Sequence, residues 1–280
     1  MKVLVTGANG QLGQDVVLLF RKDHEVLGLG RDGLDITNAD QVRTQVLAFH
    51  PDVIIHCAAY TAVDLAETEV VQAYAVNAVG TRNLAVAAQE VGAKICYIST
   101  DYVFNGTGTQ PYREYDNTDP QSVYGASKRA GEILTQTLNH RYFIVRTSWV
   151  YGEYGNNFVK TMLKFGRERD ELKVVHDQIG SPTYTVDLAQ FLLELVQTDK
   201  FGVYHASNTG ACSWFEFAQA IFEEASIEVR TVPCTTEEFP RPAKRPSNSV
   251  MEHLSIRTNG LTDLRPWREA LRDFLSQHKG

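Results

Sequence analysis

Short apolar runs alternate with longer amphipathic stretches through the first half of this chain. Runs such as Val53-Ile54-Ile55-His56 are too uniformly apolar for a sheet that faces water on one side. We therefore expect an α/β protein, a doubly wound parallel sheet covered by helices on both faces. The expected strands are 3–6, 25–29, 53–56, 95–99 and 143–147, and the expected helices are 11–21, 39–49, 73–91 and 124–138.

After about Trp149 the alternation becomes looser. It predicts helices at 157–167, 186–196, 214–224 and 267–277, with short strands at 173–175 and 203–205. We expect residues 1–148 to form the large domain. Residues 149–280 should be mainly a smaller C-terminal lobe, with some segments returning to the large sheet. The proline-rich basic segment 238–247 is predicted to be an exposed loop.

Composition excludes several classes of protein. The net charge is −7 and there is no Lys/Arg run, which argues against nucleic acid as a partner, because neutralising phosphates takes clustered cations. No stretch of about 20 apolar residues is present, so we expect no membrane span. The four cysteines show no metal-binding spacing, so we expect no metal site. The same cysteines fit the reducing conditions of the cytoplasm. No Ser/His/Asp nucleophile arrangement is evident. The oligomeric state stays open, a homodimer included.

Gly7, Gly10 and Gly13 lie directly between the first predicted strand and the first predicted helix. Glycines at this spacing permit a tight turn and close backbone approach, and the helix N-terminus then meets a pyrophosphate. The pattern predicts a dinucleotide-binding Rossmann domain, although a plain strand-to-helix turn would also carry glycines.

The end of the second predicted strand bears on the choice of cofactor. Arg31 favours the 2′-phosphate of NADPH, whereas the neighbouring Asp32 keeps NADH open. Asp35 and Ile36 follow, where an acceptor and an apolar side chain can cover an adenine. Further predicted cofactor contacts are small or polar residues near the third strand and in the helix after it: Ala58, Ala59, Tyr60, Thr61 and Asn77. For Asn77, a role in helix surface polarity is nearly as good an interpretation.

Tyr124 and Lys128 are four residues apart in a predicted helix. That spacing places a phenol and an ammonium on one helical face, where the cation can lower the pKa of the phenol. Such a pair can protonate an oxygen. Thr100 ends another predicted strand, where open α/β sheets place their ligands, and can hold a ketone oxygen.

Together the motifs Thr6-Gly7-x-x-Gly10-x-x-Gly13, Ser99-Thr100-Asp101 and Tyr124-x-x-x-Lys128 resemble those of the extended short-chain dehydrogenase/reductase family. Most members of that family act on nucleotide sugars. Further segments are similar to the branch that reduces the C4 ketone of dTDP-4-dehydro-L-rhamnose. These are residues 10–13, 62–64, 99–104, 146–152 and 177–183. They lie in the first two thirds of the chain, and the last third matches only in general character.

The resemblance implies a nucleotide-sugar oxidoreductase that uses NADPH or NADH and takes a dTDP-sugar as substrate. Tyr124 would be the acid, Thr100 would hold the ketone oxygen, and Lys128 would also bind the nicotinamide ribose. Trp149 would stack on a thymine or line the sugar pocket, although an aromatic at that place is otherwise most often core. The implied cofactor contacts also include Asn9, Gln11 and Leu12, and the implied substrate contacts are Thr100, Asp101, Val103, Phe104, Trp149, Asn157 and Thr183.

Alternatives remain at this stage. Dehydratases of the family carry Thr-Asp-Glu, and here Tyr102 stands in place of the glutamate, which disfavours water elimination. Another nucleotide-sugar epimerase or reductase would share Tyr124 and Lys128. A non-catalytic, NADP-binding regulatory subunit would need the glycines but not the acid.

Overall fold

A parallel six-stranded sheet forms the centre of the protein in the computed structural model, which describes residues 1–277. The last three residues of the predicted second lobe lie outside this range. The strands lie in the order β10-β5-β4-β3-β1-β2, and all their pairings are parallel. The predicted fold class is therefore confirmed. The strands are β1 (Lys2–Thr6), β2 (Glu25–Leu29), β3 (Val53–His56), β4 (Lys94–Thr100), β5 (Tyr142–Thr147) and β10 (Gly202–His205).

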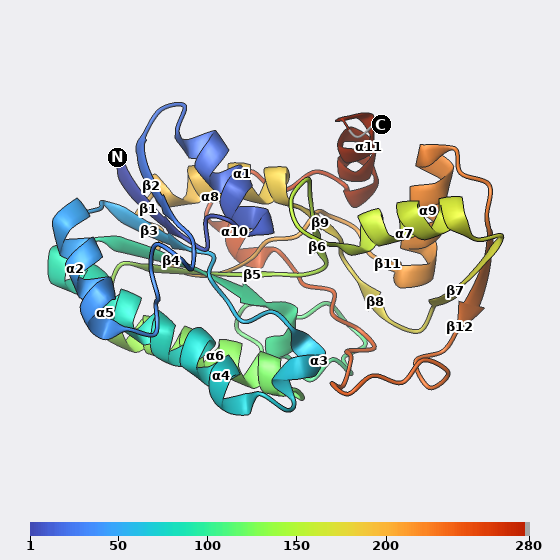
Figure 1. The fold of residues 1–280 in the computed structure, drawn as a ribbon, viewed down its shortest axis with the longest axis horizontal. Coiled ribbons are helices and arrows are strands. Elements are labelled where there is room, and N and C mark those ends of the chain that lie inside the picture. Colours follow the sequence, from blue (N-terminus) through green and yellow to red (C-terminus); the bar gives the residue numbers. More distant parts are fainter. Residues whose placement is uncertain (278–280) are drawn as a thin grey trace.

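Helices cover both faces of this sheet (Figure 1). Successive strand residues point to opposite faces, so Val3 and Val5 pack with α1 and α8, whereas Leu4 packs with α2 and α5. The first face carries α1 (Gln11–Phe20), α8 (Thr185–Val196) and α10 (Leu254–Thr258). The second carries α2 (Ala39–Phe49), α5 (Thr81–Val91) and α6 (Val123–Leu138), with the short α3 (Val63–Ala66) and α4 (Val70–Tyr74) beside α6.

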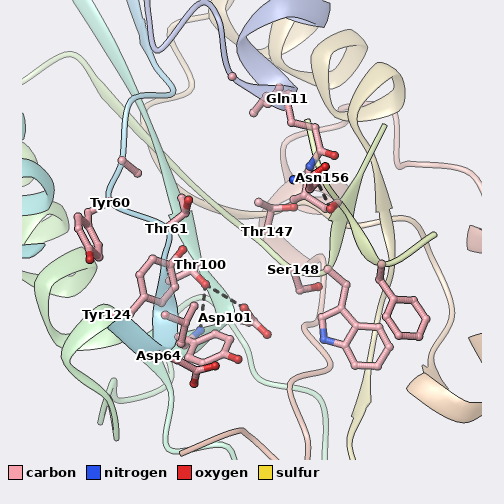
Figure 2. A pocket seen from close by; sticks show the side chains of 18 of the residues that line it. Gln11, Tyr60, Thr61, Asp64, Thr100, Asp101, Tyr124, Thr147, Ser148 and Asn156 are labelled. Carbon is pink, nitrogen blue, oxygen red and sulfur yellow. Dashed lines mark hydrogen bonds between the residues drawn. The ribbon is translucent and has the colours of Figure 1, made fainter. Parts of the chain in front are cut away.

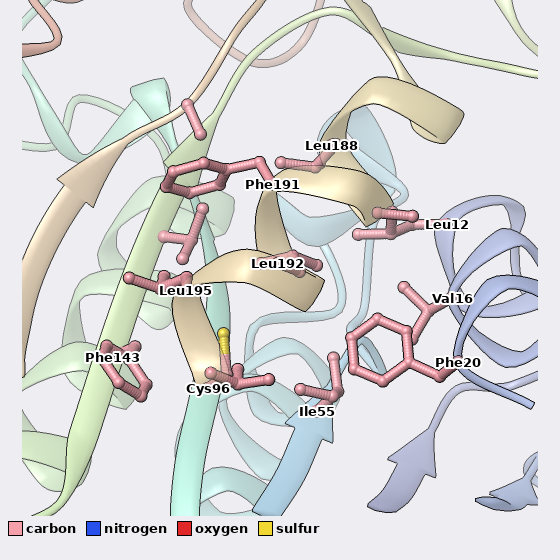
Figure 3. Close-up of a cluster of buried hydrophobic side chains, with 14 of the residues drawn as sticks. Leu12, Val16, Phe20, Ile55, Cys96, Phe143, Leu188, Phe191, Leu192 and Leu195 are labelled. Carbon is pink, nitrogen blue, oxygen red and sulfur yellow. The ribbon is translucent and has the colours of Figure 1, made fainter. Parts of the chain in front are cut away.

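Two segments from the second half of the chain belong to the large sheet layer. Strand β10 pairs with β5, and helix α8 packs beside α1 on the sheet. In Figure 3, Phe191 and Leu195 of α8 lie over the strands next to Phe143 and Cys96, and Leu12 and Phe20 of α1 approach from the other side. The largest hydrophobic core thus joins residues almost 190 positions apart, from Val3 to Leu192.

The smaller lobe lies beyond the carboxyl ends of the strands (Figure 1). Its core packs aromatic side chains such as Phe217 and Phe274 between three helices. Helix α9 begins with a capping box, in which the Ser213 and Glu216 side chains each bond to the other residue's backbone N–H. The elements are β6 (Val150–Tyr151), α7 (Phe158–Glu168), β7 (Glu171–Val175), β8 (Ile179–Gly180), β9 (Thr183–Tyr184), β11 (Cys212–Ser213), α9 (Trp214–Ala225), β12 (Arg230–Cys234) and α11 (Trp267–Gln277).

Two local expectations were wrong. Strand β12, which pairs with β7, was missed because Arg230-Thr231-Val232-Pro233-Cys234 has no clear apolar alternation. The helix expected at 73–91 is interrupted by a π-helical turn, Ala75–Gly80. The segment 238–247 is a mostly exposed loop, as expected, although Ala243 is buried and Arg245 forms an ion pair with Asp64.

Helix α6, with 16 residues, is the longest helix of the described chain. A bilayer crossing takes about 20 apolar residues. Across residues 1–277 no helix has both the length and the apolar composition that such a crossing requires.

The packing of α8 predicts the effect of truncating one of its leucines. Leu192 is fully buried between α1 and the sheet, so Leu192→Ala should lower the free energy of unfolding by about 2–5 kcal/mol through lost burial and a cavity. Urea denaturation measures the change. As a control, Leu18→Ala on α1 removes a side chain that is 54% exposed and should cost less than about 0.5 kcal/mol. Equal losses for the two variants would contradict this packing.

Candidate active site

A cleft of about 1890 Å³ opens where the strands of the sheet end, between the sheet layer and the smaller lobe. Pockets for single drug-sized ligands measure roughly 300–1,000 Å³. This cleft therefore has room for more than one small molecule. Its wall includes the ends of β1, β3, β4 and β5 on one side and residues of α7, β7 and α9 on the other.

The glycine-rich turn forms one corner of the cleft. Gly7 has φ +68°, and a Cβ at this position would lie 2.6 Å from the Ala58 backbone nitrogen. This close approach lies between β1 and β3. The strand order reverses here, because β2 lies on one side of β1, and β3, β4 and β5 lie on the other, and open α/β sheets bind ligands at such a point. Asn9, Gly10, Gln11 and Leu12 follow along the wall. Gly13 does not line the cleft, because it packs with its Cα against the Gly7 carbonyl.

The corner continues past the end of β2. A Cβ on Gly30 would lie 2.3 Å from Asn9 Nδ2, so a side chain here would require the Asn9 amide to move. Arg31, Asp35 and Ile36 all line the cleft, as predicted for cofactor contacts. The Asp35 carboxylate accepts hydrogen bonds from the Thr37 backbone N–H (2.9 Å) and hydroxyl (2.7 Å), which hold the pKa of Asp35 below its usual value.

The turn from Ala58 to Thr61 lies along the cleft and is held from behind by Asn77. The Asn77 side-chain oxygen Oδ1 accepts from the Tyr60 N–H (2.8 Å), and the side-chain Nδ2 donates to the Tyr60 carbonyl (3.1 Å) and the Ser127 hydroxyl (2.9 Å). Asn77 is buried and is not part of the cleft wall, so the interpretation as helix surface polarity is wrong. Its contacts orient the backbone that lines the cleft.

Thr100, Tyr124 and Lys128 meet on one wall, although they come from two elements. Thr100 is the last residue of β4, and Tyr124 and Lys128 lie in the first two turns of α6. This helix begins where the Ser122 hydroxyl accepts from the Gly125 N–H (3.1 Å). Figure 2 shows Thr100, Asp101 and Tyr124 together on one side of the pocket, with Gln11, Ser148 and Asn156 opposite.

Lys128 points into the protein at the back of this wall. Its ammonium donates to the Ile98 carbonyl (2.6 Å) and lies 4.0 Å from the centre of the Tyr97 ring. Burial lowers the pKa of Lys128 to about 7, and the same cause raises the pKa of Tyr124 well above its usual value, opposed by a hydrogen bond to Thr100. The prediction that Lys128 lowers the pKa of Tyr124 is therefore wrong for this structure.

A buried ion pair holds α6 on the sheet one turn beyond Lys128. The Glu132 carboxylate, fully buried, accepts from Arg146 Nε and Nη2 of β5 (2.9 Å each) and from the Ser99 hydroxyl of β4 (2.6 Å). Arg129 adds a further contact to Glu132 (3.1 Å). A buried carboxylate requires such partners, and these tie the helix that carries Tyr124 to the two strands beneath it.

Asp101 lies beside the phenol of Tyr124, and its side chain is nearly inaccessible to water. It accepts a hydrogen bond from the Thr100 hydroxyl (2.9 Å). Burial raises the pKa of Asp101 to about 6, and the hydrogen bond from Thr100 limits that rise. Asp101 can thus accept or donate a hydrogen bond near neutral pH.

The predicted substrate residues separate into two groups. Trp149 lines the cleft and stacks on Trp214 of the smaller lobe, with ring centres 3.5 Å apart. Four others do not line it. Val103 and Phe104 are buried with Tyr112 and Met251, Asn157 caps α7 and donates to the Gln11 amide oxygen (2.8 Å), and Thr183 is fully buried.

Several residues of the cleft were not predicted from the sequence as part of the site. They include Asp64, Tyr102, Ser148 and Trp214. Arg245 also lines the cleft, and it belongs to the basic segment for which the sequence allows either neutralisation of a diphosphate or a solvated loop. Tyr102 and Ser148 adjoin predicted residues and could have been included on that basis. Trp214 comes from the last third of the chain and carries no local signal, because only the tertiary fold brings it to the cleft.

A Ser–His–Asp chain occurs in the structure, but it is not arranged as a nucleophile. The Ser207 hydroxyl lies 3.0 Å from His253 Nε2, and His253 Nδ1 lies 2.7 Å from Asp263. Ser207 and His253 are both buried, and none of the three residues lines the cleft. With its hydroxyl inaccessible, this chain connects β10 to the segment around α10.

Comparisons with known proteins agree over the whole chain. A family model described as RmlD substrate binding domain matches residues 1–279. The spore coat polysaccharide biosynthesis protein SpsK of Bacillus subtilis is 47% identical, covering 99% of this chain and 97% of its own. A dTDP-4-dehydrorhamnose reductase of Aggregatibacter actinomycetemcomitans is 44% identical, with 98% of each covered. The crystal structure of dTDP-4-dehydrorhamnose reductase from Bacillus anthracis in complex with NADP is 51% identical, with a TM-score of 0.97 and 99% of each chain covered.

The geometry at Gly7 predicts a specific loss of dinucleotide binding. Gly7→Ala places a methyl group against the Ala58 backbone, so the affinity for NADPH should fall at least about tenfold. Fluorescence titration with NADPH measures the affinity.

Gly92→Ala is the matched control. Gly92 has a similar φ of +71°, but nothing lies within 4 Å of the added Cβ and the residue is not part of the cleft wall. This variant bears the same backbone strain and should bind NADPH normally. Equal affinities for the two variants would show that the turn does not approach the cofactor.

Proposed function

The chain belongs to the family described as RmlD substrate binding domain, and we propose that it catalyses the reaction for which its relatives are named. It is an NADPH-dependent oxidoreductase that reduces the C4 ketone of dTDP-4-dehydro-L-rhamnose to give dTDP-L-rhamnose. The observation that carries this proposal is the cleft itself. The glycine turn and the hydroxyls of Thr100 and Tyr124 line the same cavity, whose volume suits a dinucleotide and a nucleotide sugar together.

The residues at the glycine corner fit a dinucleotide. Gly7 and Gly30 both line the cleft and carry no side chain, so the backbone can approach a ligand closely at both places. Arg31 is exposed at the rim, where its guanidinium can pair with a 2′-phosphate. This arrangement supports NADPH, and the family member from Bacillus anthracis was crystallised in complex with NADP.

When bound, NADPH supplies a hydride that is added to C4 of the sugar. The ketone oxygen, held between Thr100 and Tyr124, then gains negative charge and needs a proton. Burial keeps Tyr124 protonated at neutral pH, so the phenol holds the required proton until that charge develops. Lys128 is proposed to bind the nicotinamide ribose, and Asp101 to accept from a sugar hydroxyl.

Only some of the substrate residues predicted from the sequence are proposed to contact the substrate directly. Trp149, backed by Trp214, forms a flat apolar wall suited to a sugar or a base. Asn157 and Asn77 are proposed to act indirectly, through Gln11 and Tyr60. Elimination chemistry lacks support, because Tyr102 occupies the place where dehydratases of the wider family carry a glutamate and brings no carboxylate.

We also propose the division of the chain near residue 148 into a Rossmann domain and a mainly substrate-binding lobe, with 185–205 and 254–258 returning to the first. The four cysteines are free, which supports a reducing compartment such as the cytoplasm.

Removing the phenol hydroxyl should separate chemistry from binding. Tyr124→Phe keeps the ring and its packing on Tyr102, but removes the proton donor, so kcat should fall about 10²–10⁴-fold. NADPH oxidation followed at 340 nm with dTDP-4-dehydro-L-rhamnose measures the rate, and fluorescence titration should show unchanged NADPH affinity. Full turnover by this variant would remove Tyr124 from the mechanism.

The lowered pKa of Lys128 predicts a pH dependence. With a pKa of about 7 the side chain is charged below neutral pH and neutral above it, so any interaction that needs the cation is lost as the pH rises. The ratio kcat/KM for NADPH should therefore decline with a midpoint near 7 in the wild type. A profile that stays flat from neutral into alkaline pH would contradict a role for the Lys128 cation.

A further inference from the structure

One segment of the C-terminal half reaches across the cleft to the residues beside the proton donor. We call residues 243–252 the strap. The strap lies between the loop that follows Asp101 and strand β8. Asn248 N–H donates to the Gly106 carbonyl (3.0 Å), Ser249 N–H donates to the Ile179 carbonyl (2.8 Å), and Tyr112 N–H donates to the Val250 carbonyl (2.9 Å). These backbone bonds hold the strap in one position.

Gly106 shows how closely the strap is packed. It has φ +75°, and a Cβ there would lie 2.5 Å from the Pro246 side chain. The Ser247 hydroxyl also donates to the Gly106 carbonyl (2.8 Å). Pro246 follows Arg245 directly, so this contact fixes the backbone from which the Arg245 side chain extends.

Arg245 forms an ion pair across the cleft with Asp64. Its Nη2 lies 2.8 Å from Asp64 Oδ2, and the Ala243 N–H donates to Asp64 Oδ1 (3.2 Å). Asp64 belongs to α3. The next contact along this element ties it to α6, because the Glu67 carboxylate accepts from the Val123 N–H (2.9 Å), the residue before Tyr124.

Arg245 and Tyr102 line the same small pocket beside the cleft, and the Arg245 charge opposes the rise that burial causes in the pKa of the Tyr102 hydroxyl. The Tyr102 ring in turn packs edge-to-face on the Tyr124 ring, with centres 5.5 Å apart and planes at 76°. Contacts of this kind favour one relative orientation of the two rings. Asp64, Tyr102, Tyr124 and Arg245 all line the cleft, and Figure 2 shows Asp64 on the same side of the pocket as Tyr124.

We propose that Arg245 is a positioning residue for the proton donor Tyr124 and that it acts through Tyr102. The ion pair with Asp64 fixes the orientation of Arg245. The inference rests on the proposed reduction, and it gives the strap a part in that reaction. Arg245 lies beside Tyr102, and Tyr102 packs on the Tyr124 ring, so Arg245 can act without touching the sugar. Removal of the link should affect the rate of the proton-coupled step more than substrate binding, because a displaced acid lowers kcat.

A double-mutant cycle between Arg245 and Tyr102 tests this. Arg245→Gln and Tyr102→Phe should each lower kcat about tenfold at saturating NADPH and sugar, with KM for the sugar changed less than about twofold. The double variant should be no slower than either single one, because both changes break the same link. Lys244→Gln is the control, since Lys244 is exposed and adjacent on the strap, and it should retain the wild-type kcat.

Other outcomes would overturn the inference. Losses that multiply in the double variant, an unchanged kcat in Arg245→Gln, or a loss confined to KM would each show that Arg245 does not act through Tyr102. Thermal melting checks that each variant is folded. If Arg245→Gln does not fold, Asp64→Asn replaces it in the same cycle, with the same expected kcat. A wild type that fails to oxidise NADPH with this sugar would refute the proposed function itself, which separates the two failures.

Discussion

The buried pairing of Glu132 with Arg146 and Ser99 holds the geometry of the site together. Tyr124 and Lys128 belong to a helix, whereas Thr100 ends a strand, so their separation depends on how that helix lies on the sheet. Glu132 joins α6 to β4 and β5 at once, one helical turn past Lys128. Loss of one partner would leave an uncompensated charge in the interior, so the pair is costly to break and the register of the helix is well defined.

The same edge of the sheet brings cofactor and substrate residues together. Parallel strands all end at one edge, and the change of direction between β1 and β3 leaves a crevice there that the glycine turn can occupy. The second half of the chain completes the cleft in two ways. Helix α8 and strand β10 extend the sheet layer, whereas α7, α9, β7 and the strap form the opposite wall. A cavity of this size results only when both halves are folded.

Much of this could be predicted from the sequence, for physical reasons that differ between regions. Apolar runs such as 53–56 predict buried parallel strands, and Gly7, Thr100, Tyr124 and Lys128 lie in short motifs whose chemistry is local. The sequence could not show that burial, rather than the Lys128 charge, controls the pKa of Tyr124, because burial is a tertiary property. Nor could it show that Phe104 and Thr183 face the interior, or that Trp214 and Arg245 reach the cleft from the last third of the chain.

The central claim is that hydride from NADPH is added to C4 of a dTDP-linked 4-keto sugar while the protein supplies the proton. It is tested most directly by NMR of the sugar formed from dTDP-4-dehydro-L-rhamnose and NADPH that carries deuterium at the transferred position. The account predicts one deuterium at C4 of dTDP-L-rhamnose for each NADPH oxidised, with none at C3 or C5. An unlabelled product, or a changed sugar without net oxidation of NADPH, would contradict it and point to an epimerase.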